Sequence, residues 1–593
     1  MTEAEGAPLF GVERSIRGRT WRLATADEGA SAALVRRFGL PEVAARAMAA
    51  RGIGEDDARS YLEPTLRALM PDPLTLCDMD RAVDRLARAV LSREPVAVFG
   101  DYDVDGATSA ALLVRYLRGL GVAVSVRIPD RLTEGYGPNA AAVRELARSA
   151  RLLVTVDCGV TAFEALSAAR EAGMEAVVLD HHQAEGDLPS ALAVVDPKRP
   201  GDASGMDNLA AVGVVFLLLA GLNRALRGAG AFSSGHSEPD LLRLLDLVAF
   251  GTVCDVVPLV GLNRAFVAQG LKVLAARGNL GLATLADTAG ITGPLSAYHI
   301  GFVLGPRINA GGRVGTSDLG VRLLTCDDPA EAATLAEELE RHNGERREIE
   351  AATLLAAIEQ VESTMPPDSA VAVAAGEDWH PGVVGLVAAR LKERFNVPAC
   401  AVTFQGGRGK GSGRSVPGVN LGAAILAARE AGILLSGGGH AMAAGFTLTR
   451  DRLSDFCTFL SDQVRAQIHG TTPAADLILD AALDVVGANA ALVASLTRMQ
   501  PFGPGNEEPR FAVPSVRLGR VDVVGAGHVR GHAYGSGGGR LKIIAFRAAD
   551  DDLGQALLTH RDRPIHLAGT LRADTWQGRT DVQLVLEDAA WAE

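Results

Sequence analysis

Lysine, paired cysteines and aromatic residues are all scarce in this 593-residue chain. Lysine occurs at only five positions, so arginine supplies nearly all of the positive charge, and a single arginine is weak evidence for a binding site. The six cysteines include no C-x-x-C pair, which disfavours zinc ribbons and a disulfide framework. Aromatic residues make up 5% of the chain, so no row of base-stacking side chains is evident.

Targeting and membrane-spanning signals are also missing. The first residues lack the basic and apolar regions of a signal peptide, and the most apolar run, about 209–222, is shorter than the roughly 18 residues that a membrane span needs. We therefore expect a cytoplasmic protein that does not enter a membrane. The net charge of −13 argues against a general basic coat for nucleic acid, but it leaves room for a local basic channel and suits a carboxylate cluster that collects divalent cations.

The length predicts several domains, because one domain typically has about 100–200 residues. Residues up to about 79 look helical and irregular, and residues 327–363 are charged, alanine-rich and helical. The second stretch fits either a solvated helix that joins two domains or a helix packed on its own domain. We expect five parts, namely an N-terminal segment (1–78), an α/β domain (79–325), a connecting helix (326–366), a second α/β domain (367–470) and a β-rich C-terminal domain (471–593).

Short apolar runs alternate with helical stretches in the first α/β domain. The five runs are 96–99, 122–128, 152–156, 176–179 and 192–195. This pattern predicts a parallel sheet that is covered by helices on both faces, and ligands of such sheets bind at the carboxyl ends of the strands. The C-terminal domain instead shows β-type runs at 515–524, 528–534, 541–546, 565–574 and 581–586, as in a small barrel of the OB type.

Three aspartates follow the first apolar run in the segment V-A-V-F-G-D-Y-D-V-D-G: Asp101, Asp103 and Asp105. Carboxylates so close together repel one another unless a cation is bound, and hard oxygen ligands suit Mg²⁺ or Mn²⁺. The same letters also open a calcium loop of the EF-hand type, or could form a merely solvated acidic loop. An EF-hand would need a preceding helix and a glutamate seven residues later, and the chain has a strand and no such glutamate.

Two further strands are predicted to end in the same kind of residue. Asp157 follows the run 152–156, and Asp180, His181 and His182 follow the run 176–179. One aspartate at a strand end is usually a helix cap, but three such strand ends meet at one edge of a parallel sheet. Asp255 lies in apolar surroundings, where an unpaired carboxylate is costly, so it is either hydrogen-bonded structurally or a further metal ligand; beside the cluster we favour the metal.

Together these segments resemble the DHH phosphoesterase superfamily, whose name matches Asp180-His181-His182, and more narrowly its RecJ branch. Six other segments resemble RecJ in the same order: 128–137, 305–313, 379–385, 411–415, 437–445 and 501–506. The resemblance covers about residues 79–593. It implies an α/β fold in which a parallel-sheet DHH domain is joined by a long helix to a second α/β domain, the DHHA1 domain, followed by a C-terminal OB-type β-barrel.

The resemblance also implies two Mn²⁺ or Mg²⁺ ions and a role for each ligand. Asp157 bridges the ions, Asp103 lies on one ion, and Asp105, His181 and Asp255 lie on the other, with Asp101 close by. His182 contacts the scissile phosphate or acts as an acid, so that the catalytic residues are His182, Asp157 and His181. Two cations about 3.5–4 Å apart can activate a bridging water and clamp the attacking and leaving oxygens.

Substrate contacts are expected from Arg131, Tyr136, Arg307, Asn309, Arg313, His380, Lys410, Ser412, Arg414, Ser415 and His440. The loop expected at Gly409–Ser415 offers close backbone approach, a hydroxyl and two cations to a phosphate, although it could equally be a flexible hairpin. It is not a Walker loop. The turn before His440 could hold a structural histidine, the arginines could form surface salt bridges, and Tyr136 could pack instead of stacking.

The function that the resemblance implies is a 5′→3′ exonuclease specific for single-stranded DNA, which releases nucleoside 5′-monophosphates in DNA repair and recombination. The alternatives are a phosphodiesterase for oligoribonucleotides or cyclic dinucleotides, and an inactive replication scaffold. Expected partners are single-stranded DNA, a single-strand-binding protein and a RecQ-type helicase, and we expect a monomer.

Overall fold

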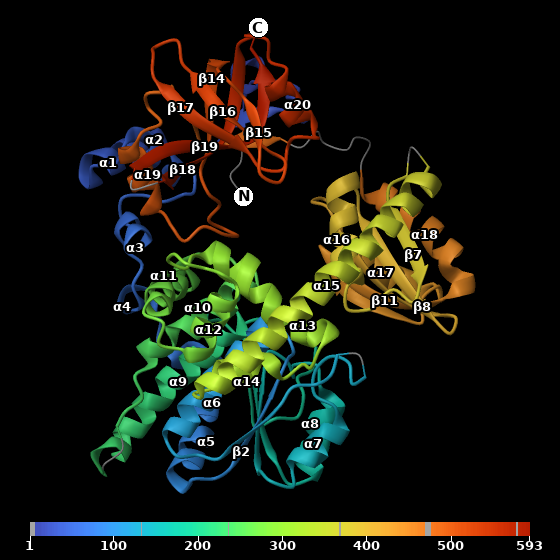
Figure 1. The fold of residues 1–593 in the computed structure, drawn as a ribbon. Helices are drawn as coiled ribbons and strands as arrows, with labels where there is room; N and C mark the ends of the chain where they lie inside the picture. Colours follow the sequence, from blue (N-terminus) through green and yellow to red (C-terminus); the bar gives the residue numbers. More distant parts are fainter. Residues whose placement is uncertain are drawn as a thin grey trace. The chain divides into compact units, whose positions relative to one another are not determined.

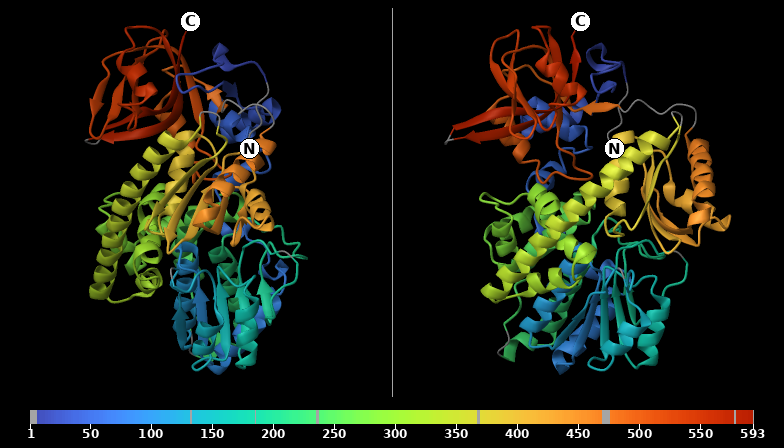
Figure 2. Two further views of the ribbon diagram at one scale, coloured as in Figure 1. Left: turned by 90° about the vertical axis from the view of Figure 1, so that its right-hand side faces the viewer. Right: turned by 45° about the vertical axis from the view of Figure 1, so that its right-hand side comes forward.

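The computed structural model describes residues 6–131, 133–184, 186–234, 237–366, 369–468, 476–576 and 579–592 (Figures 1 and 2). The chain forms two compact units. One consists of Met1–Asp72, Val256–Lys272 and Pro473–Glu593, and the other of Pro73–Asp255 and Val273–Thr472. Most of the expected N-terminal segment belongs to the same unit as the C-terminal domain. The domain limits expected from the sequence stay predictions.

A five-stranded parallel sheet forms the first α/β domain, as predicted. The strands are β2 (Val96–Gly100), β3 (Val124–Arg127), β4 (Leu152–Val156), β5 (Glu175–Leu179) and β6 (Ala193–Val195). Their order is β3-β2-β4-β5-β6, and every neighbouring pair is parallel. β2 and β4 are wholly buried apolar runs, which is what a sheet covered on both faces requires.

Helices cover both faces of this sheet (Figure 1). α7 (Ala140–Leu146) and α8 (Phe163–Glu171) share one apolar core with Phe99, Leu153 and Val178. The other face carries α5 (Met79–Ser92), α6 (Val104–Gly119) and α9 (Ala211–Gly228). Among the described residues, α9 is the one helix long and apolar enough to cross a membrane, but 72% of it is buried inside the protein, where it packs on α5 and α6.

Helices complete this domain and lead out of it. They are α10 (Leu245–Cys254), α12 (Leu280–Thr288), the π-helix η5 (His299–Leu304), α13 (Gly305–Val314), α14 (Leu319–Thr325) and α15 (Pro329–Thr364). α15 is a single long helix, as the composition of residues 327–363 indicated (Figure 2). It is not merely solvated, because it packs on α12, α13 and α14 and also on the next domain through Ala357 and Val361.

The second α/β domain is built on a mixed five-stranded sheet. Its elements are β7 (Ala372–Glu377), α16 (Val384–Phe395), β8 (Ala399–Gln405), β9 (Arg408–Arg414), α17 (Leu421–Glu430), β10 (Ser436–His440), β11 (Ala443–Thr449) and α18 (Leu453–Gln467). The order is β10-β11-β9-β8-β7, with only the β7–β8 pair parallel. One apolar core lies under α17 and α18, and another under α15 and α16.

The other unit carries the β-rich C-terminal domain. Its strands are β13 (Ala481–Ala482), β14 (Arg510–Leu518), β15 (Asp522–Val524), β16 (His528–Tyr534), β17 (Arg540–Ala545), β18 (Ile565–Trp576) and β19 (Arg579–Trp591). The order is β13-β14-β18-β19-β17-β16-β15, and two residue pairs also join β14 to β16. The single run expected at 515–524 is two strands, and the closed barrel stays a prediction.

The N-terminal residues are folded onto this β domain. β1 (Trp21–Leu23) pairs in parallel with β12 (Leu477–Leu479), and the helices are α1 (Glu28–Phe38), α2 (Glu42–Ala49), α3 (Ala58–Leu62) and α4 (Leu66–Leu69). Leu34 and Met48 share an apolar core with Phe511 and Leu567. The sequence pattern of residues 1–78 shows helices but not their partner, because the partner lies more than 400 residues away in the chain.

Candidate metal centre and phosphate-binding face

The strand-end residues lie together at the carboxyl edge of the parallel sheet. Asp101 follows β2, Asp157 follows β4, and Asp180, His181 and His182 follow β5. β4 lies between β2 and β5, so these three strand ends are direct neighbours. Asp255 comes from elsewhere, at the carboxyl end of α10, and α10 packs on α6. The topology thus gathers the acidic residues that the sequence singled out.

Local backbone geometry fixes the first and second strand ends. Asp103 caps α6 by accepting the backbone N–H of Gly106 at 3.1 Å. A Cβ at Gly106 would lie 2.4 Å from the carbonyl oxygen of Asp101, so the turn admits only glycine there. Asp157 has φ 59, in the left-handed region that aspartate adopts more readily than most other non-glycine residues.

Three sets of donor atoms are close enough to hold ions. They are Asp101, Asp103 and Asp157; Asp105, His181 and Asp255; and Asp157, His181 and His182, with the atoms of each set within 4.8 Å of one another. Asp157 belongs to the first and third sets, and His181 Nε2 lies 3.3 Å from its Oδ1. The first two sets have no residue in common, but Asp157 of the first lies next to His181 of the second.

The chemistry of these donors fits a metal ion better than a hydrogen-bond network. His181 Nδ1 lies 3.0 Å from the carbonyl oxygen of Leu209, which requires the proton on Nδ1 and leaves Nε2 as an acceptor. That Nε2 faces carboxyl oxygens of Asp105, Asp157 and Asp255 at 3.3–3.8 Å, and an ionised carboxylate offers only acceptors. Within the described part of the chain, His181 Nε2, Asp101 Oδ1 and Asp255 Oδ2 are buried without a hydrogen-bond partner.

The acidity of the cluster shows the same lack of positive charge. Burial and the charge of Asp103 raise the pKa of Asp105 to about 7. Burial and the charges of Asp105 and Asp103 raise the pKa of Asp255 to about 9. Burial also raises the pKa of Asp101 and Asp157 well above the usual value, whereas burial and the charge of His182 lower the pKa of His181 to about 3. A neutral imidazole beside crowded carboxyls is a good cation ligand.

Backbone groups at the start of α9 orient two of these donors, Asp105 and His181, through hydrogen bonds. Asp105 accepts the backbone N–H groups of Ala211 at 2.6 Å and Val212 at 3.0 Å, so its carboxylate caps the helix as well as facing the cluster. The carbonyl of Leu209, just before α9, holds His181. Both donors are therefore fixed by backbone groups, which keeps a multi-ligand site in one geometry.

His182 differs in character from His181. Its Nδ1 lies 2.7 Å from Asp180 Oδ1, and the Tyr136 hydroxyl lies 3.3 Å from the same nitrogen. Burial opposes the charge, but the hydrogen bond and charge of Asp180 outweigh it and raise the pKa of His182 to about 9. His182 is thus a cation with a proton to donate, whereas Asp180 also accepts the N–H groups of Val160 and His181 and does not belong to the ligand sets.

Three arginines that the sequence analysis predicts to contact the substrate lie close enough for their charges to affect one another. They are Arg131, Arg313 and Arg414. Burial and the charges of Arg131 and Arg346 lower the pKa of Arg313 to about 10, and Arg414 adds to this effect. Burial and Arg131 also lower the pKa of Arg414. Arg131 lies over the ring of Tyr102, directly after Asp101, at 5.2 Å. A group of cations that repel one another beside a carboxylate cluster suits a polyanionic ligand.

The segment expected as a glycine-rich loop is a strand, β9, in the middle of its sheet. Its glycines face the core under α17 and α18, where a Cβ at Gly411 would lie 2.2 Å from the Phe446 ring. The alternate residues Lys410, Ser412 and Arg414 face the other side, because neighbouring residues of a strand point to opposite faces. Arg414 Nη1 donates to Ser412 Oγ at 3.0 Å. His440 lies in the same row as Arg414, with Ala443 between them.

The remaining substrate candidates divide into two groups. His380 Nδ1 accepts the N–H of Gly382, whose carbonyl accepts from Arg313 at 3.0 Å, so His380 lies beside the arginines. Ser415 does not, because it is buried and its hydroxyl donates to the carbonyl of Val419 at 2.8 Å. Arg307 is already engaged by Glu340 and by the carbonyl of Val303. Asn309 lies half-buried on α13.

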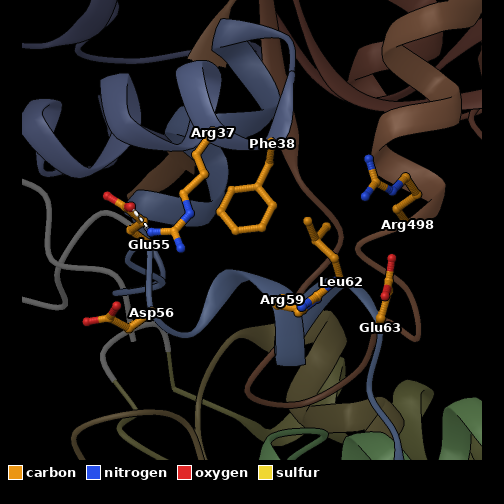
Figure 3. A pocket seen from close by; sticks show the side chains of 8 residues that line it. All are labelled: Arg37, Phe38, Glu55, Asp56, Arg59, Leu62, Glu63 and Arg498. Atoms are coloured by element: carbon orange, nitrogen blue, oxygen red, sulfur yellow. Dashed lines mark hydrogen bonds and ion pairs between the residues drawn. The ribbon is translucent and has the colours of Figure 1, made fainter.

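The surface also carries hollows of similar volume. One of about 460 Å³ adjoins Tyr136 and the turn after β4. Another, of about 480 Å³, lies in the unit that holds the N-terminal helices and the β-rich domain (Figure 3). Around Phe38 and Leu62 it places three arginines and three acidic residues, and Arg37 pairs with Glu55. These balanced charges give no concentrated field for a phosphate.

Three family models match the chain. They are the DHH family N-terminal domain at residues 95–252, the DHHA1 domain at 368–466 and the RecJ OB domain at 479–588. The single-stranded-DNA-specific exonuclease RecJ of Dickeya dadantii is 36% identical over 565 residues, which are 92% of this chain and 96% of that protein. The chain belongs to the RecJ family.

Other RecJ proteins agree with this assignment. RecJ of Escherichia coli is 34% identical over 93% of this chain and 96% of its own length. The structure of RecJ from Thermus thermophilus in complex with Mn²⁺ covers 97% of this chain and 80% of that one, with a TM-score of 0.81 and 30% identity. A second structure of that protein is in complex with Mg²⁺, with a TM-score of 0.76 and 29% identity.

Sequence reasoning missed some features of this RecJ-family site. Asp180 was noted only as part of the motif, yet it orients His182 and the turn around it. The signal was available, because a carboxylate two residues before a histidine can bond it across a turn. The backbone carbonyl of Leu209 that holds His181 had no signal, because any residue carries a carbonyl. The six cysteines are free.

Proposed function

We propose that this chain is a metal-dependent exonuclease that degrades single-stranded DNA in the 5′→3′ direction and releases nucleoside 5′-monophosphates. The observation that carries the proposal is the set of buried acceptors without donors at the sheet edge: His181 Nε2, Asp101 Oδ1 and Asp255 Oδ2. Membership of a family whose named relatives are single-stranded-DNA-specific exonucleases supports it. The polarity and the product rest on the family resemblance.

Two Mn²⁺ or Mg²⁺ ions supply the charge neutralisation and the activated water that phosphodiester hydrolysis needs. We assign Asp157 as the shared ligand and Asp103 to one ion, with Asp101 beside it. Asp105, His181 and Asp255 are assigned to the other ion. The grouping of donor atoms within 4.8 Å supports this division.

His182 is assigned to the scissile phosphate. The hydrogen bond and charge of Asp180 raise the pKa of His182, which favours the imidazolium that can donate a hydrogen bond to a phosphate oxygen or a proton to the leaving oxygen. Asp180 holds the imidazole from behind, and the hydroxyl of Tyr136 contacts the same ring. The acid and its orienting partner thus come from the same turn.

We assign the arginine group, which consists of Arg131, Arg313 and Arg414, to the phosphate backbone of the bound DNA strand. Arg131, Arg313 and Arg414 carry charge that no carboxylate ion pair offsets within the described residues, and Ser412 and His380 lie beside them. Phosphate contacts position a strand without reading its sequence, which fits an exonuclease that must accept every base. Lys410, Asn309 and His440 remain candidates for further contacts.

The two alternatives are not favoured by the comparisons. The RecJ relatives match this chain over most of its length, and the RecJ OB domain is present. Every candidate ligand is also present, which argues against an inactive scaffold. We further propose a cytoplasmic monomer that acts in DNA repair and recombination, with a single-strand-binding protein and a RecQ-type helicase as partners; the family resemblance supports these points.

Digestion of single-stranded DNA labelled at either end tests the proposal. With Mn²⁺, the wild-type protein should release mononucleotides from the 5′ end, and EDTA should stop the release. Asp157→Ala should abolish the activity, because it removes the ligand assigned to both ions. Intact DNA under all these conditions would reject the exonuclease, and release from the 3′ end would reject its polarity.

A further inference from the structure

Two aromatic rings stand exposed together on the π-helix η5 and on the residue before it. Phe302 is 74% exposed and Tyr298 is 62% exposed, and Phe302 is the most exposed large apolar side chain in the described part of the chain. The two residues are four positions apart, so they share one face of the helix. Their ring centroids lie 5.3 Å apart with an interplanar angle of 27°, so the rings stack on each other in solvent.

The backbone beneath the rings is firmly held. The rings of Tyr298 and His299 meet in a T-shaped arrangement, and His299 Nδ1 accepts the N–H of Ser296 at 3.2 Å. Arg307 donates to the carbonyl of Val303 at 2.6 Å and pairs with Glu340 on α15. The rings are therefore presented by a braced element. A π-helix inside a helical region often marks a functional site.

This element packs against the helix that ends at the metal centre. The thiol of Cys254 lies 3.6 Å from the carbonyl oxygen of Ile300, and a Cβ at Gly301 would lie 3.4 Å from Val253. A Cβ at Gly305 would lie 2.5 Å from Cys254 Sγ, so glycine lets η5 and α13 approach α10 this closely. The next residue after Cys254 is Asp255, a member of one ligand set.

We propose that Tyr298 and Phe302 form a stacking platform for unpaired bases of the strand that enters the metal centre. The proposal rests on the proposed function, because it takes the ligand to be single-stranded DNA. Every base has a π-face, so aromatic platforms bind single strands without regard to sequence. Two rings are also far smaller than the roughly 800 Å² per partner of a stable protein interface. The arginine group holds phosphates, and this pair holds bases.

Binding without hydrolysis separates base stacking from phosphate contacts. The probes are a fluorescent oligothymidylate and an abasic oligonucleotide of the same length, each titrated in Ca²⁺ with EDTA as a parallel condition. The wild-type protein should bind the oligothymidylate more tightly. Tyr298→Ala/Phe302→Ala should bind the oligothymidylate about 5- to 100-fold more weakly and the abasic strand unchanged.

Three further variants control this result. Tyr298→Leu/Phe302→Leu keeps apolar bulk without π-faces and should behave as the alanine variant does. Tyr298→Phe/Phe302→Tyr keeps both rings and should bind as the wild type does. Leu91→Ala changes another exposed apolar residue, 54% exposed at the end of α5 before the amino end of β2, and should have no effect.

A direct readout is the fluorescence of 2-aminopurine placed in the strand, which the wild-type protein should quench and the leucine variant should not. Equal losses on both strands, or no loss on the oligothymidylate, would overturn the platform, and the latter result would point to a protein partner for the rings. If the wild-type protein binds bases but leaves labelled DNA intact, the proposed exonuclease fails while the platform stands.

Discussion

Replacing Asp157 by asparagine should change the protein's stability in opposite directions with and without divalent cations. The carboxyl is 2% exposed, and burial together with the charges of Asp103, Asp105, Asp101 and Asp255 raises its pKa well above the usual value. Asparagine has the same shape and tolerates the φ of 59 at this position. The substitution therefore removes the charge with little change in geometry.

The sign of the effect on the metal-free protein follows from the direction of that pKa change. When the fold keeps a carboxyl neutral, the protein loses about 1.4 kcal/mol of stability for each pH unit above the pKa that this carboxyl has in the unfolded chain. The cluster shares its protons among several groups, which reduces the share of any one of them. We expect Asp157→Asn to be about 1–3 kcal/mol more stable than the wild type in EDTA at pH 7.

The sign reverses when Mn²⁺ is added. An ion that binds only the folded state stabilises it by about 2.7 kcal/mol at 100 times its dissociation constant. The variant should lose most of this gain, because a neutral amide replaces the ligand assigned to both ions. The result would not depend on any assay of DNA cleavage.

Thermal unfolding in EDTA and in excess Mn²⁺ measures both effects, and Asp187→Asn, at an exposed aspartate, serves as the control. The reasoning is refuted if Asp157→Asn is less stable than the wild type in EDTA and gains as much from Mn²⁺.

Three other predictions concern groups around the centre and in the other unit. Burial raises the pKa of Asp246 to about 6, so the contribution of its neutral carboxyl to stability is present below about pH 4 and is lost as the pH rises through 6. Urea unfolding should therefore show Asp246→Asn to be more stable than the wild type at pH 8 but not at pH 4. Asp180→Asn should lower the rate of DNA hydrolysis about 10- to 100-fold, because His182 loses its charged partner. Mn²⁺ should still raise the melting temperature of this variant, because no assigned ligand changes. An unchanged rate would remove Asp180 from the mechanism. The buried side chain of Arg264 donates to four backbone carbonyls, those of Tyr61, Met499, Gln500 and Pro501. Arg264→Ala should therefore lower the free energy of unfolding of its unit by about 3–5 kcal/mol, as measured in denaturant. A loss below 1 kcal/mol would show that these carbonyls find other donors.

The parallel sheet and its acidic edge could be predicted from the sequence, because both follow from short-range patterns. β2, β4 and β5 are short runs of mostly apolar, buried residues, and the polar residues after them meet wherever such strands are neighbours and parallel. The same rule does not apply to β9, which alternates glycine with polar residues. Its glycines are there because Phe446 and Leu421 pack over them, and the sequence pattern alone does not reveal those distant neighbours.

The pairing of distant segments was also beyond the sequence. Trp21 is fully buried and donates to Asp588, which also accepts from Ser15, so the first residues of the chain are held by the last strand. The exposure of Tyr298 and Phe302 could not be predicted from the sequence for a related reason. An apolar helix with two aromatic residues looks like a core helix until the structure shows which of its sides is exposed.

The two-ion centre is tested most directly by anomalous diffraction at the manganese edge from crystals of the protein grown with Mn²⁺. We predict two peaks, one at bonding distance from Asp103 and Asp157, and the other at bonding distance from Asp157, Asp105, His181 and Asp255. A single peak, or peaks at other residues, would contradict the account.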